Sequence, residues 1–483
     1  MAAHVATGAC RRADIAIVGG GLAGLAAALE AAALAPARAV LLLEKEPKIG
    51  GNSAKASSGI NAALDAQDAP RFRDDTLASG GGLSLEPTVA KLVGQSPDAI
   101  AFLEQRGVDL SVLSQLGGHS AARTHRNAKG PNVGFAIVSA LQKTIQDSAA
   151  ASSKAIEVLT SVSVDKVRYE DGKVVGLQIS RTGESGAVEN ETIDAPVVIL
   201  ATGGFSASQE LLKKFVPGME EFPTTNGPWA RGEGLALAQQ VGADLLHMDK
   251  VQLHPTGFIN PKDRDAKQKF LAPEAIRGSG AVLLNTQGKR FVNELATRDR
   301  VSEAILAQPG KRAFLALFEG AKPLESSLGF YKHIGLVKLV QSVREAAEYL
   351  QLDDANELLR ELNEYAESAA GARSDRFGKS VFPFPLPHIE NVDAPVEIHV
   401  MEVAPAVHYT MGGVRANENA QVLRADGSVI QGLYAAGEVA GGLHGANRLG
   451  GNSLAECVVF GRIAAQQAVH QLENPTGGER ARL

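Results

Sequence analysis

The stretch DIAIVGGGLAGLAAALEAAALA (residues 14–35) joins a short β-rich run to a long alanine- and leucine-rich segment typical of a helix. Between them GGGLAG fits the pattern GxGxxG, in which Gly19 allows a tight turn, Gly21 a close approach of a pyrophosphate, and Gly24 close helix–strand packing. The amide groups and the dipole at the helix N-terminus favour an anion there. The stretch therefore predicts the strand–turn–helix unit of a Rossmann-like domain.

The next apolar run, AVLLLE (residues 39–44), supports this prediction. Apart from Asp14 and Glu44 both runs are apolar, as expected of parallel strands that are covered on two faces. Glu44 follows the second run, where a carboxylate can bind ribose hydroxyls. A single glycine-rich motif can be an ordinary turn, but the two strands and the acid together favour dinucleotide binding.

The rest of the chain predicts an α/β protein with an insertion. Residues 156–180 alternate with a period of two and contain the turn signal Asp171-Gly172, which predicts a β-meander attached to the main domain. Short helical patterns and a proline-rich run change the character of the chain between about 249 and 405. We expect a Rossmann-like domain formed by residues 1–248 and 406–483, and an α+β domain inserted at 249–405.

Composition limits the possible functions. A chain of 483 residues is expected to form more than one lobe, and 45% hydrophobic with 21% charged residues is typical of a soluble globular protein. The 48 basic and 54 acidic residues form no basic stripe, which argues against nucleic acid, and no apolar run is long enough to span a membrane. Two distant cysteines do not suffice for an iron–sulfur cluster, so redox chemistry would need an organic cofactor.

The two ends of the chain bear on its location. The first strand is expected to begin by Ile15, which leaves no room for a cleaved signal peptide and favours the cytoplasm. The terminal Ala481-Arg482-Leu483 resembles a relaxed peroxisomal address, so a peroxisome or related microbody is the alternative.

Further glycine-rich segments favour FAD over NAD as the dinucleotide. GGNSAKASSGIN (residues 50–61) follows Glu44, and a nicotinamide domain has no need of a second small-residue loop there. YAAGE (434–438) and GANRLGGNSLAE (445–456) supply another turn that opens a helix, whose N-terminus could stabilise the negative edge of a reduced flavin. Ordinary sheet-to-helix turns are the alternative interpretation.

Seven motifs spread over nearly the whole chain identify a resemblance. They are GGNSAKASSGINAA, HPTGF, APEAIRGSG, GKRFVNELATRD, HYTMGG, YAAGE and GANRLGGNS. With these motifs the chain resembles the flavoprotein family of fumarate reductases and succinate dehydrogenases, and most closely the soluble single-chain fumarate reductases. Asn52 stands where membrane-bound relatives carry a flavin-linked histidine, so the resemblance implies noncovalent FAD. It also implies that the inserted domain at 249–405 is a mobile capping domain that closes over the substrate. The chain stops where those relatives add a C-terminal domain, so we expect no iron–sulfur subunit, and we expect a monomer.

The resemblance implies which residues bind FAD. They are Gly19, Gly20, Gly21, Leu22, Ala23, Gly24, Glu44, Lys45, Gly51, Asn52, Ser53, Ser57, Ser58, Gly59, Ile60, Val164, Ala201, Thr202, Gly203, Glu233, Gly437, Glu438, Asn452, Ser453 and Leu454.

Three further residues are candidates for holding a substrate. A dianion such as fumarate must be gripped and polarised by cationic or donor groups. His254, His408 and Arg448 are such groups, but a lone histidine at 254 is more often a structural hydrogen-bonder, and a surface ion pair is the alternative for Arg448. The resemblance implies that all three clamp the substrate.

Arg298 in NELATRDR (residues 293–300) is the candidate proton donor. From the residues alone a solvated, ion-paired loop is the simpler interpretation. The resemblance implies that Arg298 gives the substrate a proton while flavin N5 gives a hydride, and that Glu274 and Arg277 resupply the proton. Fumarate would thus be reduced to succinate.

Some features leave alternatives open. Pro273 stands where close relatives often have a threonine that contacts substrate, and Tyr409 replaces a histidine of some relatives. A flavin ene-reductase for another unsaturated carboxylate is therefore the second hypothesis, and a redox-silent FAD-binding protein the third. The electron donor is open among reduced free flavin, a NADH-linked partner and a quinol. The resemblance also implies that backbone carbonyls around Thr410, Met411, Gly412, Glu438 and Ala440 could hold a monovalent cation.

Overall fold

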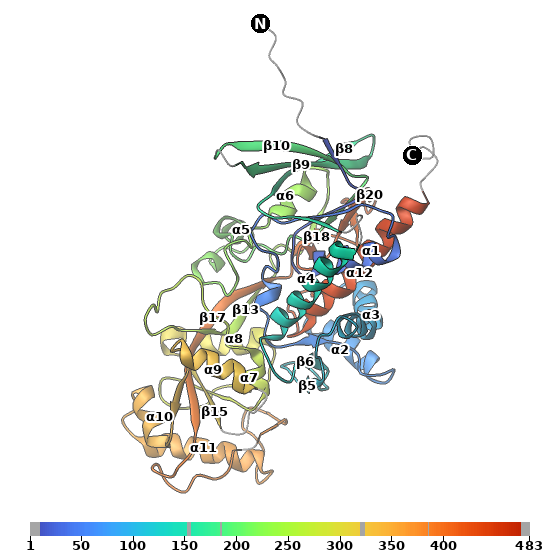
Figure 1. Ribbon diagram of the computed structural model, residues 1–483. Coiled ribbons are helices and arrows are strands. Elements are labelled where there is room, and N and C mark those ends of the chain that lie inside the picture. The colour runs from blue at the N-terminus through green and yellow to red at the C-terminus, as the bar shows by residue number, and fades with distance from the viewer. Residues whose placement is uncertain (1–9, 152–155, 184–185, 319–323, 385, 475–483) are drawn as a thin grey trace.

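A twisted ten-stranded sheet forms the first lobe of the computed structural model, which describes residues 10–151, 156–183, 186–318, 324–384 and 386–474 (Figure 1). The strand order is β1-β10-β9-β20-β11-β2-β3-β7, with β8 beside β9 and β19 beside β20. The strands are β1 (Cys10–Arg12), β2 (Ile15–Val18), β3 (Val40–Leu43), β7 (Glu157–Leu159), β8 (Ser163–Glu170), β9 (Lys173–Thr182), β10 (Val188–Asp194), β11 (Val197–Leu200), β19 (Gln421–Leu423) and β20 (Val429–Ala435).

The centre of this sheet is parallel, as predicted. β20, β11, β2, β3 and β7 pair in parallel, and β2, β3 and β11 are buried along their whole length. Helix α1 (Leu22–Leu34) follows β2 and packs against the long C-terminal helix α12 (Asn452–Glu473). Both belong to one apolar core with the remaining helices on that side, α2 (Asp68–Ser79), α3 (Glu86–Glu104) and α4 (Val133–Ala151).

A second apolar core lies on the opposite face, and the antiparallel strands β8, β9 and β10 at one side of the same sheet contribute to it. The predicted turn at Asp171-Gly172 is confirmed, because both residues have the positive φ of a two-residue hairpin turn, 50° and 83°. The predicted start of the meander at residue 156 is wrong. Residues 157–159 form β7 and pair in parallel with β3, and the hairpin begins only at Ser163.

A five-stranded antiparallel sheet with helices around it forms the second lobe, which lies at the bottom of Figure 1. Its strands are β13 (Val251–Phe258), β14 (Val282–Leu284), β15 (Ala313–Phe318), β16 (Lys338–Val340) and β17 (Ile398–Thr410). Its helices are α7 (Glu274–Gly278), α8 (Arg298–Leu306), α9 (Glu325–His333), α10 (Val343–Leu350) and α11 (Ala355–Ala369). Two apolar cores, separate from those of the first lobe, fill this part.

The long strands β13 and β17 pair with each other and lead back to the first lobe. Since β17 continues to Thr410, the strand crosses the predicted boundary at residue 405, and the division at 249 and 405 stays a prediction. The remaining elements are short: β4 (Ile60–Asn61), β5 (Val112–Ser114), β6 (Thr124–Arg126), β12 (Leu245–Leu246), β18 (Gly413–Arg415), β21 (Ala440–Gly441), α5 (Gln209–Phe215), α6 (Glu233–Gln239), and the 3-10 turns η1 (Ser53–Lys55), η2 (Met219–Glu221) and η3 (Pro309–Lys311).

Two other sequence predictions concern a membrane-spanning segment and the C-terminal tripeptide. Among the helices that the structure describes, none is long and apolar enough to cross a membrane. The C-terminal tripeptide Ala481-Arg482-Leu483 lies outside the described residues.

Candidate active site

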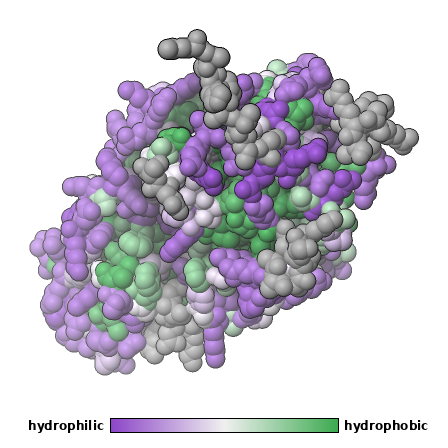
Figure 2. Space-filling model, turned by 45° about the horizontal axis from the view of Figure 1, so that its top comes forward, coloured by the Kyte–Doolittle hydropathy of each residue, from purple (hydrophilic) through white to green (hydrophobic). Residues whose placement is uncertain are grey.

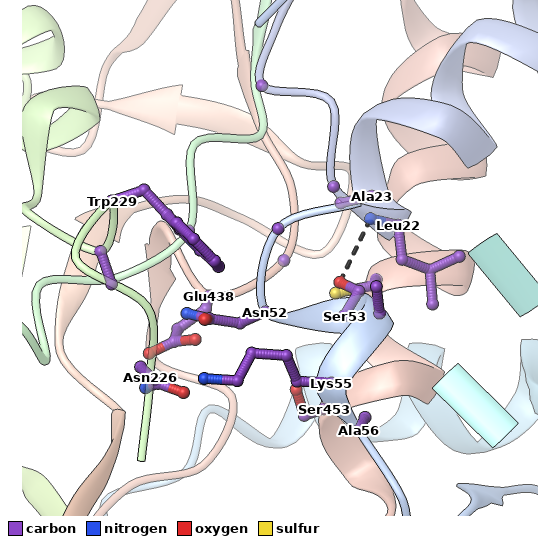
Figure 3. Close-up of a pocket in the computed structure, with 18 of the residues that line it drawn as sticks. Leu22, Ala23, Asn52, Ser53, Lys55, Ala56, Asn226, Trp229, Glu438 and Ser453 are labelled. Atoms are coloured by element: carbon purple, nitrogen blue, oxygen red, sulfur yellow. Dashed lines mark hydrogen bonds between the residues drawn. The ribbon is translucent and has the colours of Figure 1, made fainter. Parts of the chain in front are cut away.

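A cavity of about 930 Å³ lies between the main sheet and the second lobe. Residues of both lobes line it, and its size is at the upper end of the range for cofactor sites. Figure 2 shows a recess on one face of the molecule in which apolar residues gather, and Figure 3 shows side chains that point into the cavity.

The glycines after β2 shape one wall of this cavity. Gly19 has φ 110°, and a side chain there would collide with the carbonyl oxygen of Ala201. A side chain at Gly24 would collide with the carbonyl oxygen of Gly19, which explains the close packing of α1 against the strand. At Gly21 the nearest atom to an added Cβ would be 3.8 Å away, so this backbone is open to the cavity.

The predicted ribose-binding acid also lines the cavity. Glu44 follows β3, and its Oε2 accepts a hydrogen bond from the Gly20 amide at 2.7 Å. Its Oε1 accepts one from the Glu46 amide at 2.8 Å, so the carboxylate is held in place by backbone groups. An open glycine turn at a helix N-terminus and a fixed acid in one cavity suit a dinucleotide.

Most of the predicted FAD contacts lie in the wall of this one cavity. The lining includes Gly19, Gly21, Leu22, Ala23, Glu44, Lys45, Gly51, Asn52, Ser53, Ser57, Ser58, Gly59, Val164, Ala201, Thr202, Gly203, Glu233, Gly437, Glu438, Ser453 and Leu454. Gly20, Gly24, Ile60 and Asn452 lie behind the wall. Asn452, for example, is buried and accepts a hydrogen bond from Asn61 Nδ2 at 2.7 Å.

Sequence reasoning missed several polar residues that line the same cavity. Lys55 donates from Nζ to the Thr225 carbonyl at 2.8 Å, and burial lowers the pKa of this lysine. Trp229, the only tryptophan of the chain, has a buried Nε1 without a hydrogen-bond partner. Figure 3 shows Lys55, Asn226 and Trp229 around Asn52, whose Oδ1 accepts from the Gly227 amide at 2.9 Å. Asn226 and Trp229 lie in the irregular segment 224–232, which has no strand or helix pattern that could have drawn attention to it.

Arg298 lies at the far end of the cavity and is not part of a solvated loop. It is the first residue of α8, only 5% of its surface is exposed, and it lines the cavity. Nε and Nη2 both lie 2.7 Å from Glu274 Oε2, while Nη1 donates to Gln252 Oε1 at 3.0 Å. The side chain is therefore fixed by two neighbours, of which Gln252 was not predicted.

Glu274 and Arg277 lie directly behind Arg298, outside the cavity wall. Both are buried in α7, and Arg277 Nη2 is 3.8 Å from Glu274 Oε1, which also accepts from the Gly117 amide at 2.9 Å. Burial opposes ionisation of Glu274, but the charges of Arg298 and Arg277 outweigh it and lower its pKa to about 2. The result is a chain of charged groups from the cavity into the second lobe.

The two predicted histidines are adjacent but differ in access to the cavity. His408 lines it, and His254 packs behind with ring centroids 5.0 Å apart. Burial, and then the charge of Arg298, holds the pKa of both rings well below the usual value, so both are neutral. The Thr256 amide donates to His254 Nδ1 at 3.2 Å, which places the single ring proton of His254 on Nε2.

Arg448 completes the charged end of the cavity. Only 3% of this residue is exposed, its guanidinium carbon lies 4.2 Å from the centroid of the Tyr409 ring, and its Nε has no partner. Burial and the charge of Arg298 lower its pKa to about 10, so it remains a cation at neutral pH. Tyr409 in turn donates its hydroxyl to Glu456.

Glu438 lies in the wall near Arg448. It accepts hydrogen bonds from the amide and the hydroxyl of Thr410 at 3.0 and 3.1 Å. Burial raises its pKa to about 7 in spite of these bonds. Thr410 is the last residue of β17, and Met411 and Gly412 follow it. The next strand, β18, pairs in parallel with β21, where Ala440 lies. The candidate cation ligands thus come from adjacent segments, and the cation site stays a prediction.

Several known proteins are similar to this chain over most of its length. A family model described as FAD binding domain matches residues 14–454. The chain is 42% identical over 467 residues to Fumarate reductase 1 of Saccharomyces cerevisiae, covering 94% of this chain and 97% of that protein. It is 37% identical over 471 residues to Fumarate reductase of Schizosaccharomyces pombe, covering 94% and 88%. The open conformation of a flavocytochrome c3 fumarate reductase is similar with a TM-score of 0.72 and 32% identity, covering 96% of this chain and 79% of that one.

The fold, the cavity and these similarities define an FAD-binding oxidoreductase. More particularly, the chain belongs to the flavoprotein family of the fumarate reductases.

Proposed function

We propose that this protein reduces fumarate to succinate. The observation that carries the proposal is the charged end of the cavity, where Arg298, Arg448 and neutral His408 line one wall. The Arg448 guanidinium suits a substrate carboxylate, because its planar fork can bind one in a bidentate way, and the Arg298 cation adds positive charge at the same end of the cavity. When bound, reduced FAD supplies a hydride to one alkene carbon, and the neighbouring carbon then needs a proton.

Arg298 is proposed to supply that proton. It lies at the cavity end of a buried path, and Glu274 contacts it at 2.7 Å. Glu274 is ionised at neutral pH because its pKa is about 2, so it can return a proton to Arg298 only by passing one on from Arg277. Gain of one hydride and one proton balances the conversion of fumarate to succinate.

The remaining groups are proposed to hold the two carboxylates. Thr225 Oγ1 lies 2.6 Å from His408 Nδ1, and with the hydroxyl as donor the ring proton stands on Nε2, free to bind substrate. His254 supports His408 from behind and its own Nε2 has no partner. We propose that the second lobe moves as a cap over the substrate, since Arg298 lies on α8 of that lobe and Arg448 on the first.

Pro273 is the reason to consider a second candidate function. It precedes α7 and cannot offer a hydroxyl to a carboxylate. The second candidate function is therefore the reduction of another unsaturated carboxylate. For the electron donor we propose a reduced flavin or a NADH-linked partner. Anaerobic turnover of the purified protein with a panel of alkenoates and reduced donors tests the proposal. Fumarate should be the fastest substrate, and succinate the product; no turnover with any alkenoate would favour a redox-silent FAD-binding protein.

We predict that FAD is bound without a covalent link. Asn52, at the place of the linked histidine of some relatives, is engaged through Oδ1 with the Gly227 amide and has no nucleophilic ring nitrogen. Acid precipitation should leave all the flavin in the supernatant, as measured by its absorbance. Flavin fluorescence in the washed precipitate would show a covalent bond.

A further inference from the structure

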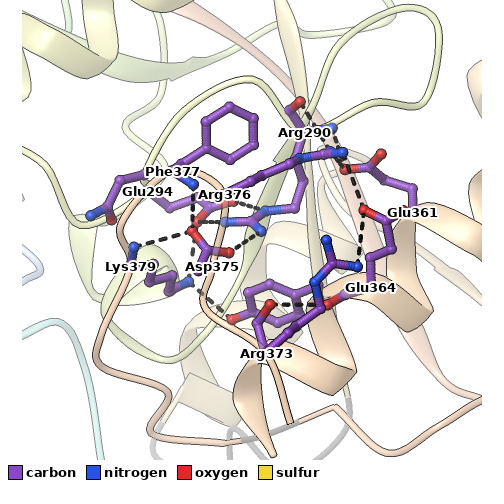
Figure 4. Close-up of polar contacts among 12 residues, drawn as sticks. Arg290, Glu294, Glu361, Glu364, Arg373, Asp375, Arg376, Phe377 and Lys379 are labelled. Carbon is purple, nitrogen blue, oxygen red and sulfur yellow. Dashed lines mark hydrogen bonds and ion pairs between the residues drawn. The ribbon is translucent and has the colours of Figure 1, made fainter. Parts of the chain in front are cut away.

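A second group of buried charges lies in the second lobe, away from the cavity (Figure 4). We call Arg290, Glu294, Asp375, Lys379 and Tyr365 the Glu294 network. Glu294 accepts from Arg290 Nε at 2.8 Å and Nη2 at 2.9 Å, and from Lys379 Nζ at 3.2 Å. Arg290 Nη1 also binds Asp375 at 2.6 Å, and Lys379 binds the Tyr365 hydroxyl at 3.0 Å.

The network is fully buried and its charges balance. The side chains of Arg290, Glu294, Asp375 and Lys379 are at most 3% exposed, and they are two cations and two anions. A buried ion pair costs desolvation energy and is often no better for stability than apolar residues of the same size. Its geometry, however, is narrowly defined, because every hydrogen bond must be satisfied. Such a network is suited to fixing the position of the backbone that carries it.

The backbone held in this way leads directly to the proton path. The carbonyl oxygen of Glu294 accepts from Arg277 Nη1 at 2.7 Å. The carbonyl oxygen of Leu295 accepts from the Gly118 amide at 3.2 Å, and the preceding amide, of Gly117, donates to Glu274. The same turn then enters α8 at Arg298. Residues 294–298 thus include Arg298 and contact Glu274 and Arg277, the three groups that are proposed to deliver the proton.

We propose that Glu294 is a positioning residue for the proton path, which rests on the proposed role of Arg298 as proton donor. Its side chain is anchored in the network, and its backbone holds Arg277 and sets the start of α8. Lys379, 85 residues further along the chain, closes the network from a separate segment. The position of the donor is therefore determined by charges that touch neither substrate nor cofactor.

Glu294→Gln tests this, because it keeps the size of the side chain and removes its charge. The pre-reduced holoenzyme should be reoxidised by fumarate about 10- to 100-fold more slowly, the loss expected when a catalytic group is misplaced by about 1 Å. Fumarate binding to the oxidised enzyme should stay within about twofold, since Arg448 and His408 lie on other segments. A general loss of stability would not separate the two quantities in this way.

Two further variants keep the result interpretable. Leu362→Ala makes a cavity in the same lobe, in α11, without touching the turn 294–298, and should lower the melting temperature but not the reoxidation rate. If Glu294→Gln does not accumulate, Lys379→Met removes one partner and leaves Arg290 on Glu294; about three- to tenfold slower reoxidation is then expected.

The possible outcomes distinguish the positioning role of Glu294 from the proposed role of Arg298 as proton donor. Wild-type reoxidation by a folded Glu294→Gln or Lys379→Met enzyme, while Arg298→Ala is inactive, overturns the positioning role alone. A rate loss in Leu362→Ala as large as in Glu294→Gln also overturns it. If Arg298→Ala itself is active, the proposed role of Arg298 as proton donor is wrong, and the positioning role that rests on it is wrong as well.

Discussion

Replacement of Arg298 by alanine is expected to lower the rate of fumarate reduction by about 10²–10⁴-fold, the usual contribution of a positioned general acid. The guanidinium lies 2.7 Å from Glu274 Oε2 and is 5% exposed, so water has little access to take its place. FAD content should remain normal, because the glycine turn and Glu44 lie in the other lobe. Steady-state turnover per bound flavin measures the effect.

Two comparisons make the Arg298 result specific. Arg298→Lys keeps the charge but loses the planar fork that reaches Glu274 and Gln252 together, so it should be nearly as slow as alanine. Arg300→Ala removes an exposed arginine from the same turn of α8 and should be indistinguishable from wild type. A lysine variant with near-normal turnover would reduce Arg298 to an electrostatic role.

Replacement of Arg448 by alanine is expected to weaken the binding of fumarate by about 2–5 kcal/mol, or roughly 30- to 5,000-fold, as for loss of one partner of a buried charged pair. Arg448 is 3% exposed, its Nε lacks a partner, and the nearby acid Glu438 has a pKa of about 7. We therefore propose that a substrate carboxylate binds this guanidinium.

Titration of the oxidised protein with fumarate or succinate, followed by the flavin spectrum, gives the dissociation constant. Arg462→Ala is the matched control, because Arg462 lies in α12 and pairs with Glu30 outside the cavity wall. Unchanged affinity in Arg448→Ala would remove this arginine from the clamp.

The cofactor end of the site could be predicted from sequence because its determinants are local. The turn at Gly19–Gly24, the two apolar strands and Glu44 follow one another within one βαβ unit, where glycine positions and strand composition have direct physical meaning. The hairpin turn at Asp171-Gly172 was predictable for the same reason. Residues 157–159 were misassigned because three residues carry too little pattern to separate a parallel edge strand from a hairpin.

The substrate end could not be derived from local pattern. Arg298 and Arg300 are two residues apart and chemically alike, yet only Arg298 is buried, because α8 turns one face toward β13. Gln252 and Trp229 belong to no motif, and Lys55 stands in a motif without a predicted role of its own. Lys379 meets Glu294 only through the packing of distant segments. The resemblance to fumarate reductases suggested roles for Arg298, His408 and Arg448, and the fold places these three at one cavity.

The central claim is that Arg298 gives the proton that completes fumarate reduction. Its most direct test is the single-turnover reoxidation of pre-reduced wild-type and Arg298→Ala protein by saturating fumarate, mixed rapidly without oxygen and followed at the flavin absorbance maximum. We predict fast reoxidation of the wild type and a rate about 10²–10⁴-fold lower for the variant, although both bind fumarate. Reoxidation of Arg298→Ala at the wild-type rate would contradict the claim.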